Sequence, residues 1–410
     1  ALGKGASAAL VSRAPEGIDP AKLLIVADTQ AGLEALGRAA RARTGAKIAA
    51  VTGSVGKTST KEALRFVLGQ QGATHASEAS YNNLWGVPLT LARMPTETRF
   101  GIFEIGMNHA GEIRPLVAQV QPDVAIVTTV EPVHLEHFPH VEAIADAKAE
   151  IFEGLKPGGV AVVNADNPHA ARLAAAATRA GARVWTFGEK GGEAQLVSVA
   201  LGEASSEIEA DILGQPLSFT YGAPGRHFAQ NALGLLLVVK ALGADVAAAA
   251  GAPRGVRAGK GRGARETIAI AGGSFDLLDE SYNANPASVA AALALLGVSR
   301  PGPGGRRIAV LGDMLELGPE GAAMHAGLAP AVLAASCDLV FACGPSMSHL
   351  WAALPVSIRG AYAQSSADFA PLVAADIRPG DVVMVKGSLG SRMALVVDAL
   401  KARALEAAAG

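Results

Sequence analysis

The stretch from Lys47 to Gln70 constrains the fold of this chain more than any other. Its first part, Lys47 to Thr52, is a run of apolar and β-branched residues that predicts a buried strand. Beyond it, apolar residues recur at helical spacing, which predicts a helix from Lys57 to Gln70. A strand, a glycine-bearing loop and a helix N-terminus form an anion site, because the loop amides and the helix dipole both favour negative charge. The stretch therefore predicts an α/β protein that binds phosphate groups.

The loop between this strand and this helix has the short form of a phosphate-binding motif, Gly-x-x-Gly-Lys-Thr. Val51 stands where the longer form has its first glycine, and the short form matches more sequences by chance. A tight turn with a solvated lysine is the alternative. In a phosphate loop, Lys57 reaches the terminal phosphates and the Thr58 hydroxyl reaches Mg²⁺. Given the flanking strand and helix, we expect a nucleoside triphosphate to bind the following residues: Gly53, Ser54, Val55, Gly56, Lys57, Thr58 and Ser59.

Length and composition limit what kind of protein this is. The 410 residues predict two or three domains, and a half-apolar composition rich in Ala and Gly is typical of closely packed α/β layers. The formal charge of −2 gives no reason to expect a nucleic-acid partner or an anionic membrane. Cys337 and Cys343 lack nearby His spacing and are expected to be buried thiols. No apolar run reaches the roughly 18 residues of a membrane span and no signal peptide is evident, so we expect a cytoplasmic protein without membrane insertion.

Strand-like and helix-like segments alternate along the chain, which predicts largely parallel sheets with helical crossovers. From Lys47 to about Gly251 they form one such unit, in which the polar stretch Gln195 to Tyr221 predicts antiparallel hairpins. Before it, a strand from Leu23 to Ala27 and a helix from Thr29 to Arg43 predict the remainder of a small domain whose beginning is absent. Further strands are predicted at Phe100 to Ile105, Asp123 to Thr129, Gly159 to Asn164, Arg183 to Phe187, Arg307 to Leu311, Asp338 to Ala342 and Asp381 to Lys386, the last three in a second doubly wound unit.

The segment from Pro253 to Arg265 is rich in Gly and Arg and lacks periodicity, which predicts a hinge between domains. Its basic side chains could indicate nucleic acid. A linker that faces phosphate explains them equally well in a chain of near-neutral charge. These basic residues are Arg254, Arg257, Lys260, Arg262 and Arg265.

Polar groups follow two of the predicted strands, and function gathers beyond the carboxyl ends of parallel strands. Glu104 closes the strand that begins at Phe100, and His134 follows the strand that ends at Thr129. Both are plausible Mg²⁺ ligands near a nucleotide, Glu104 more so because Mg²⁺ prefers oxygen. The alternatives are a solvated strand end for Glu104 and a hydrogen-bonded loop histidine for His134.

Lys148 lies on the apolar face of a helix predicted from Val141 to Leu155, four residues after Ile144. A lysine there must snorkel, pair or be modified, because a buried unpaired ammonium is very costly. Snorkelling is the commoner case. Carbamylation, which would make Lys148 act as a carboxylate toward a second Mg²⁺, is the sharper hypothesis.

Six segments, in order along the chain, resemble the Mur ligases, the ADP-forming amide-bond ligases of peptidoglycan precursor synthesis. Any one of them is a weak signal, but six in family order over more than three hundred residues form a strong one. They are most similar to the branch that adds D-alanyl-D-alanine to UDP-N-acetylmuramoyl-tripeptide. The segments are Tyr81 to Thr90, Glu104 to Ile113, Ala147 to Phe152, Gly225 to His227, Asp279 to Pro286 and Val310 to Gly318.

The resemblance implies a three-domain α/β architecture that uses ATP. Residues 1–46 would be the remainder of an N-terminal domain that holds the uridine nucleotide. Residues 47–257 would be the central ATP-binding domain, with its phosphate loop on a parallel sheet. Residues 258–410 would be a Rossmann-like ligase domain that closes over ATP. We expect a monomer that acts on small molecules.

The resemblance also implies roles for single residues. Lys57 and Thr58 would hold phosphates and a Mg²⁺ ion that Glu104 also coordinates, while His134 and a carbamylated Lys148 would hold a second Mg²⁺. Further ATP contacts would come from Asn231, Arg262 and Glu280. The substrate cleft would involve Asn82, Asn83, His109, Asn283, Asp313, Lys386 and Ser388, with His109 a candidate general base from its placement alone.

Several positions leave alternatives open. Asn82 and Asn83 could be turn formers, Asn285 a helix cap before a proline, and Asp313 an ordinary loop acid. The sequence departs from the family pattern at Phe228, Glu280 and the pair Leu84-Trp85. A different Mur-fold ligase would differ in the cleft segments. A non-catalytic ATP-binding subunit should have lost Lys57, Glu104, His134 or Lys148, and all four are present.

Overall fold

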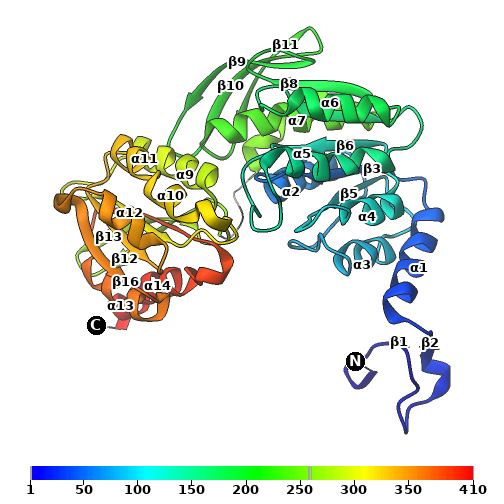
Figure 1. Cartoon of the computed structure of the whole chain (residues 1–410), viewed down its shortest axis with the longest axis horizontal. Helices are drawn as coiled ribbons and strands as arrows, with labels where there is room; N and C mark the ends of the chain where they lie inside the picture. Colours follow the sequence, from blue (N-terminus) through cyan, green and yellow to red (C-terminus); the bar gives the residue numbers. More distant parts are fainter. Residues whose placement is uncertain (1, 257–258, 260, 410) are drawn as a thin grey trace. The chain divides into compact units, whose positions relative to one another are not determined.

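The computed structural model describes residues 2–256, 259 and 261–409 (Figure 1). Arg257 and Lys260 of the predicted hinge lie outside the described residues, as does the predicted domain boundary at 257–258. The chain divides into two compact units. The first contains Ala1–Thr129, Ala145–Gln195 and Leu233–Ala249, and the second contains Val130–Ile144, Leu196–Ala232 and Ala250–Gly410.

The first unit is built on parallel strands in the order β8-β7-β6-β3-β5-β4. Apolar residues fill the central strands, and every residue of β5 and β7 is buried, as expected for a sheet covered on both faces. The predicted strands Lys47 to Thr52 and Gly159 to Asn164 are therefore confirmed to within a residue. Strand bounds are β3 Lys47–Thr52, β4 Thr74–Ala76, β5 Phe100–Glu104, β6 Val124–Val127, β7 Val160–Asn164 and β8 Arg183–Gly188.

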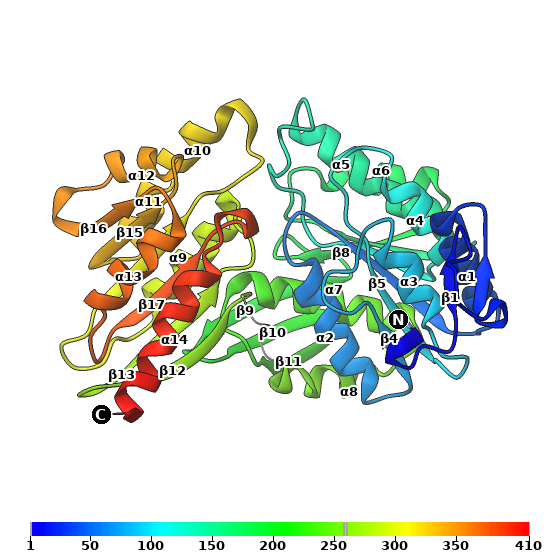
Figure 2. The same cartoon turned by 90° about the horizontal axis from the view of Figure 1, so that it is seen from below.

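Helices cover both faces of this sheet. In Figure 2, α4, α5 and α6 lie on one side of the strands, and α2, α7 and α8 lie on the other. Gly234 allows α7 to approach closely, because an added Cβ would lie 2.8 Å from Ile126 on β6. Helix bounds are α1 Thr29–Ala42, α2 Lys57–Gly69, α3 Gly86–Ala92, α4 Ile113–Val120, α5 Val141–Ala149, α6 Ala170–Arg179, α7 Arg226–Ala241 and α8 Val246–Gly251. The N-terminal strands β1 Ala9–Val11 and β2 Leu23–Ile25 form a separate parallel pair.

The predicted single helix from Val141 to Leu155 is wrong in its second half. The α-helix ends at Ala149 and a 3-10 segment, η3, continues from Glu150 to Gly154. Glu150 explains the change, because its carboxylate accepts hydrogen bonds from the backbone amides of Gly111 at 2.7 Å and Arg114 at 3.2 Å. Buried polar bonds of this kind outweigh the weak preference for one more helical turn.

The second unit contains a six-stranded sheet in the order β12-β13-β17-β14-β15-β16. All its neighbours are parallel except the β12–β13 hairpin. The sequence analysis missed that hairpin and placed Arg265 in the hinge, although β12 begins at Ala264. It also missed β4 and β16, which are short strands at sheet edges. Bounds are β12 Ala264–Ile270, β13 Gly273–Glu280, β14 Arg307–Gly312, β15 Leu339–Cys343, β16 Arg359–Ala363 and β17 Val382–Lys386.

Two apolar cores lie on opposite faces of this sheet, as in a doubly wound fold. In one core, α9 and the segment from α10 to α12 pack against the sheet; in the other core, α13 and α14 do so (Figures 1 and 2). Cys337 and Cys343 are buried free thiols, as predicted. Helix bounds are α9 Pro286–Val298, α10 Gly321–Ala326, α11 Ala329–Ala334, α12 Met347–Ala353, α13 Ser366–Asp376 and α14 Ala394–Ala409. The hairpin predicted within Gln195 to Tyr221 is confirmed by β10 Ser206–Ile212 and β11 Gln215–Tyr221, beside β9 Ala194–Leu201.

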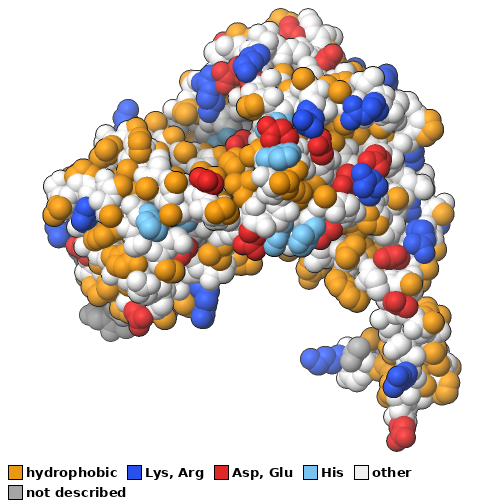
Figure 3. Space-filling model, viewed as in Figure 1, with side chains coloured by type: hydrophobic (Ala, Val, Ile, Leu, Met, Phe, Trp, Pro, Cys, Tyr) orange, Lys and Arg blue, Asp and Glu red, His pale blue; other side chains and the backbone are white. Residues whose placement is uncertain are grey.

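The surface carries both signs of charge. Acidic and basic side chains are interspersed over the face shown in Figure 3, in keeping with a formal charge of −2. Among the described residues, none of the helices combines the length and the apolar character needed to span a bilayer.

Candidate active site

The phosphate loop connects β3 to α2, as the sequence predicts. Gly53 has a φ of 148° and Gly56, the residue before α2, has a φ of 85°, both in the region that favours glycine. The Lys57 ammonium donates to the carbonyl of Gly53 at 2.6 Å, so its side chain folds back over the loop. The N-terminus of α2 and the half-buried Lys57 ammonium thus lie together at this loop, an arrangement that favours an anion.

Two threonines at the end of β6 hold this loop in place. The Thr128 hydroxyl donates to the carbonyl of Val55 at 2.6 Å, and the amide of Ser54 donates to the carbonyl of Thr129 at 2.8 Å. Space is tight here, because a Cβ on Gly53 would lie 1.9 Å from Thr128 Oγ1. From β7, Asn164 donates in turn to the carbonyl of Thr128 at 3.2 Å. The loop conformation therefore depends on strands that the motif does not include.

Glu104 lies at the carboxyl end of β5, in register with Val51 of the neighbouring β3. Its side chain is 1% exposed, and Oε1 accepts a hydrogen bond from Asn82 Nδ2 at 2.8 Å. Oε2 is buried without a hydrogen-bond partner within the described part of the chain. A buried carboxylate oxygen left unpaired is costly unless it binds a proton or a cation. The solvated strand end considered above is thus wrong, and the donor fits Mg²⁺.

The described residues contain no cluster of three His, Cys, Asp or Glu side chains that could hold a metal ion by themselves. Mg²⁺ commonly uses one or two carboxylates together with substrate phosphates and water. Glu104 and the buried Thr58, on adjacent strand and helix ends, suit that sparser kind of site.

Lys148 is 2% exposed on α5, so it does not snorkel to the surface. Burial, assisted by the positive charge of Lys57, holds the pKa of Lys148 well below its usual range. No carboxylate contributes to that shift among the described residues. The amine is thereby shifted toward its neutral, nucleophilic form.

His134 belongs to the second unit by the division above. It has a φ of 57°, and its Nδ1 forms a hydrogen bond with the carboxylate of Glu316. The structure thus places a hydrogen-bonded loop histidine here, which is the plainer of the two readings the sequence left open.

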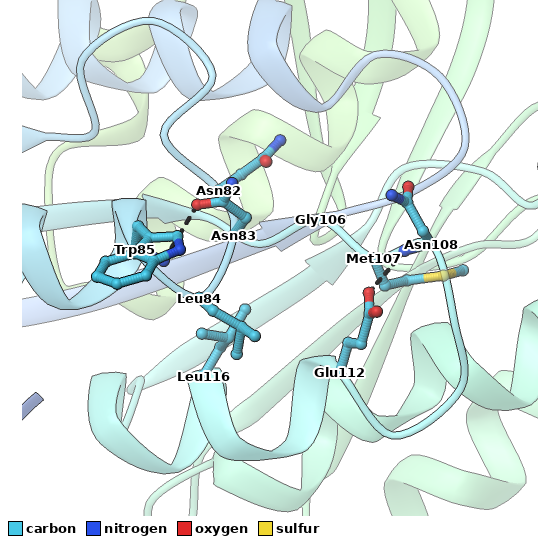
Figure 4. Close-up of a pocket in the computed structure, with 9 residues that line it drawn as sticks. All are labelled: Asn82, Asn83, Leu84, Trp85, Gly106, Met107, Asn108, Glu112 and Leu116. Atoms are coloured by element: carbon cyan, nitrogen blue, oxygen red, sulfur yellow. Dashed lines mark hydrogen bonds between the residues drawn. The ribbon is translucent and has the colours of Figure 1, made fainter. Parts of the chain in front are cut away.

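A pocket of about 370 Å³ opens in the first unit, and Asn82, which donates to Glu104, is part of its lining (Figure 4). Asn83 at its rim holds the turn before α3, since its Oδ1 accepts the amides of Trp85 at 3.2 Å and Gly86 at 2.9 Å. The Trp85 side chain is 57% exposed. His109 bonds to Glu112 at 2.9 Å and is not among the lining residues. The pocket is lined by Asn82, Asn83, Leu84, Trp85, Gly106, Met107, Asn108, Glu112 and Leu116.

A second polar cluster lies at the adjoining ends of β13 and β17 in the second unit. The buried Lys386 ammonium donates to Glu280 Oε2 at 3.2 Å and to the carbonyl of Asn283 at 3.0 Å. His227, at the start of α7, is close enough for both charges to act on it. Burial lowers the pKa of His227, while Glu280 raises it and Lys386 lowers it further. Asn231 follows one turn later on the same helix.

One departure from the family pattern, Phe228, and one expected ATP contact, Arg262, pack against aromatic rings in this unit. Phe228 is packed between two rings, with its centroid 5.8 Å from that of Tyr221 and 4.2 Å from that of His227. Arg262 lies over the ring of Tyr282 at 3.9 Å, a cation–π contact that fixes the direction of the guanidinium.

Asp313 and Ser388 have structural partners. The Asp313 carboxylate accepts the amides of Met347 at 2.8 Å and Ser346 at 3.3 Å at the start of α12. The Ser388 hydroxyl accepts the amide of Leu315 at 2.9 Å. Asn285 caps α9 with a reciprocal capping box, which confirms the alternative considered for that residue.

His325 is a buried histidine that bonds to the backbone of Met314, the residue after Asp313. Nε2 of His325 accepts the amide of Met314 at 3.0 Å, and Nδ1–H donates to the carbonyl of Gly321 at 2.6 Å. Only the neutral ring can make both bonds. Burial lowers the pKa of His325 accordingly.

Known protein families match most of this chain. Residues 51–239 match the Mur ligase middle domain, and residues 266–389 match the Mur ligase glutamate ligase domain. A UDP-N-acetylmuramoyl-tripeptide–D-alanyl-D-alanine ligase of Rickettsia prowazekii is 32% identical over 401 residues, covering 97% of this chain and 88% of the relative. This chain belongs to the Mur ligase family.

Solved structures agree with the family. A MurF structure from Acinetobacter baumannii superposes with a TM-score of 0.85 at 28% identity, covering 98% of this Mur ligase and 86% of that chain. A MurF ligase from Thermotoga maritima, solved in complex with ADP, has a TM-score of 0.82 at 24% identity and covers 99% of this chain and 90% of its own. At that identity, the second likeness concerns the fold alone.

Several site residues of this Mur ligase escaped the sequence analysis. Thr128 and Asn164 are ordinary strand residues in the sequence, and only the sheet order brings them to the phosphate loop. Lys61 lies within the helix predicted from Lys57 to Gln70, and the sequence assigned it no role, although it is completely buried. Thr128 and Asn164 are polar residues at the ends of apolar strands, the same sequence signal that indicated Glu104 and His134.

Proposed function

We propose that this Mur ligase joins D-alanyl-D-alanine to UDP-N-acetylmuramoyl-tripeptide and converts ATP to ADP and phosphate, giving the pentapeptide precursor of peptidoglycan. The observation that carries the proposal is the free buried oxygen of Glu104 beside an intact phosphate loop, in a chain whose relatives of that name align over nearly its whole length. A non-catalytic subunit would have no need to keep such a costly oxygen.

ATP is needed because a carboxylate is a poor electrophile for amide formation. The terminal carboxylate of the tripeptide attacks the γ-phosphorus, which forms an acyl phosphate and releases ADP. The amine of D-alanyl-D-alanine then attacks the acyl carbon, and the tetrahedral intermediate expels phosphate and loses a proton. Phosphoryl transfer depends mainly on positioning and charge neutralisation, which Lys57 and the loop amides supply here.

Thr58 and Glu104 would hold one Mg²⁺ ion, and His134 and a carbamylated Lys148 would hold another. Such ions neutralise charge that develops on the transferred phosphoryl group. His134 supplies a nitrogen donor whose other contact, Glu316, orients the ring. His109, hydrogen-bonded to Glu112, remains a proposed base for the incoming amine.

Carbamylation of Lys148 is supported by its surroundings. The neutral amine attacks CO₂ at carbon, an N–C bond forms as one C=O π pair moves to oxygen, and the nitrogen loses a proton to solvent, so that a neutral amine becomes an anionic carbamate. The lowered pKa of Lys148 provides the neutral amine, and the neighbouring Lys57 would stabilise the carbamate.

The remaining assignments follow the same family reading. In the second unit, Asn231, Arg262 and Glu280 would contact the nucleotide, and Asn283, Asp313, Lys386 and Ser388 would help receive the dipeptide. In the first unit, Asn82 and Asn83 would line the acceptor pocket. We propose domains at 1–46, 47–257 and 258–410, and a monomer that acts in the cytoplasm.

Phosphate release tests this function directly. The protein is given ATP, Mg²⁺ and UDP-N-acetylmuramoyl-tripeptide, with and without D-alanyl-D-alanine, and the product is weighed by mass spectrometry. Release that requires both substrates, with formation of the pentapeptide, is expected. Release restored by a single amino acid would mean a sister ligase, and ATP binding without turnover for any pair would mean a non-catalytic protein.

A further inference from the structure

Lys61 is a completely buried lysine on α2, four residues after Lys57 of the phosphate loop. A buried ammonium is tolerated only where its donors are satisfied. Lys61 Nζ meets that condition with three acceptors, Glu62 Oε1 at 2.5 Å and the carbonyls of Ser77 and Ala79, each at 2.8 Å. Two of these acceptors belong to a segment that follows β4, so Lys61 ties α2 to another part of the sheet edge.

The segment that Lys61 holds is strained. Ala79 has a φ of 44°, in the left-handed region that residues with a Cβ rarely adopt. Backbone of this kind persists only where neighbouring groups impose it, and it gathers at functional sites. The charged hydrogen bond from Lys61 to the Ala79 carbonyl is such a constraint.

The same segment controls Glu104 from two directions. The amide of Glu104 donates to the Ser77 hydroxyl at 3.3 Å, and the Asn82 amide group donates to Glu104 Oε1 at 2.8 Å. The Asn82 carbonyl accepts the amide of Gly106 at 2.8 Å, just beyond Glu104. Residues Ser77 to Asn82 therefore lie between Lys61 and the carboxylate.

We propose that Lys61 is a positioning residue that fixes the loop from Ser77 to Asn83, and through it the Glu104 carboxylate and the rim of the acceptor pocket, relative to the phosphate loop. The relation to ATP and acceptor rests on the proposed function. Helix α2 would then serve both ATP and the acceptor. Lys57, its first residue, acts in the phosphate loop, and Lys61, one turn later, positions Glu104 and the rim of the acceptor pocket.

The test compares two variants of α2. Lys61→Met removes the ammonium and keeps an apolar chain of similar length. Arg65→Met is the matched control, because Arg65 also pairs with Glu62, at 2.8 Å, but its side chain is 58% exposed and, within the described part of the chain, does not bond to the loop. Unfolding temperatures are measured for both variants and for the unchanged protein.

Amide hydrogen exchange of the ligand-free protein is the first readout. Losing two charged hydrogen bonds should speed exchange in peptides covering Ser77 to Asn83 by about tenfold or more in Lys61→Met. Exchange in β14 and β15 should stay unchanged, and Arg65→Met should resemble the parent protein. Equal acceleration throughout the chain, or no acceleration at Ser77 to Asn83, would overturn the proposal.

Kinetics provide the second readout. We expect Lys61→Met to raise KM for the tripeptide by about tenfold, with ATP affinity changed by less than about threefold, since the phosphate loop is held by Thr128 instead. Ala79→Gly relieves the strain, so Lys61→Met combined with Ala79→Gly should recover part of the loss. Equal loss in the single and double variants would contradict the role of strain.

Lys61→Gln, which keeps an amide donor, replaces Lys61→Met if that variant fails to fold, and a smaller acceleration at the same peptides is then expected. The two proposals fail separately. If the unchanged protein ligates no substrate pair, the proposed function fails, while the exchange measurements still decide the role of Lys61.

Discussion

Gly53→Ala is the sharpest test of how the phosphate loop is held. At a φ of 148°, a residue with a side chain is strained by about 1–3 kcal/mol. The added Cβ would also lie 1.9 Å from Thr128 Oγ1, far inside van der Waals contact, so the hydroxyl must move. Its hydrogen bond to the Val55 carbonyl, now 2.6 Å long, is then lost at a cost of about 1 kcal/mol.

The two effects together amount to about 2–4 kcal/mol. If the loop relaxes to escape the clash, the cost appears as roughly 30- to 1,000-fold weaker ATP binding. If the loop stays in place, the cost appears in the free energy of unfolding. Titration calorimetry with ATP and urea unfolding therefore measure the sum.

Thr128→Ala provides the matched control. It removes Oγ1 and leaves the Thr128 Cβ position, which lies 3.2 Å from the new Cβ, so the clash becomes tight contact. Thr128→Ala should consequently cost about 1 kcal/mol less in the Gly53→Ala background than in the parent protein. Additive effects would refute the clash, and a Gly53→Ala variant that changes neither ATP binding nor unfolding by more than about 0.5 kcal/mol would refute the whole argument.

Three further outcomes are expected. Lys148→Ala should lose activity and regain part of it with short carboxylic acids, and ¹³C-labelled bicarbonate should give a carbamate signal in the parent protein that fades as pH falls and the amine is protonated; full activity of the unsupplemented variant would exclude a carbamate. Because burial lowers the pKa of His325, its contribution to stability is complete above the ordinary pKa of about 6.5 and is lost as pH falls through the lowered value. His325→Gln should therefore flatten the dependence of the free energy of unfolding on pH, measured with urea from pH 8 to pH 5, and an unchanged dependence would mean that other groups titrate. Trp85→Ala should raise KM for the tripeptide several-fold while leaving the free energy of unfolding within about 0.5 kcal/mol, since the indole is 57% exposed; an unchanged KM would remove Trp85 from the acceptor site.

Local sequence patterns predicted much of the fold because they reflect local physics. The strand from Lys47 to Thr52 and the helix after Lys57 follow from periodicity and from glycines at 53 and 56, where the backbone has positive φ. Patterns failed where tertiary contacts overrode propensity. Glu150 ends α5 early by accepting the amides of Gly111 and Arg114, and β12 was missed, with its first two residues, Ala264 and Arg265, placed in the predicted hinge.

The sequence by itself determined the chemistry available to this protein. Its phosphate-loop residues and the six family segments define a Mur ligase, because motif residues act through the groups next to them in the chain. Only the tertiary structure decided which partners surround those groups and how deeply they are buried. Hydrogen-bonded pairs such as Asn82 with Glu104 join residues distant in sequence, and no local pattern encodes them. The lowered pKa of Lys148 likewise depends on burial and on Lys57, two properties that exist only after the chain has folded.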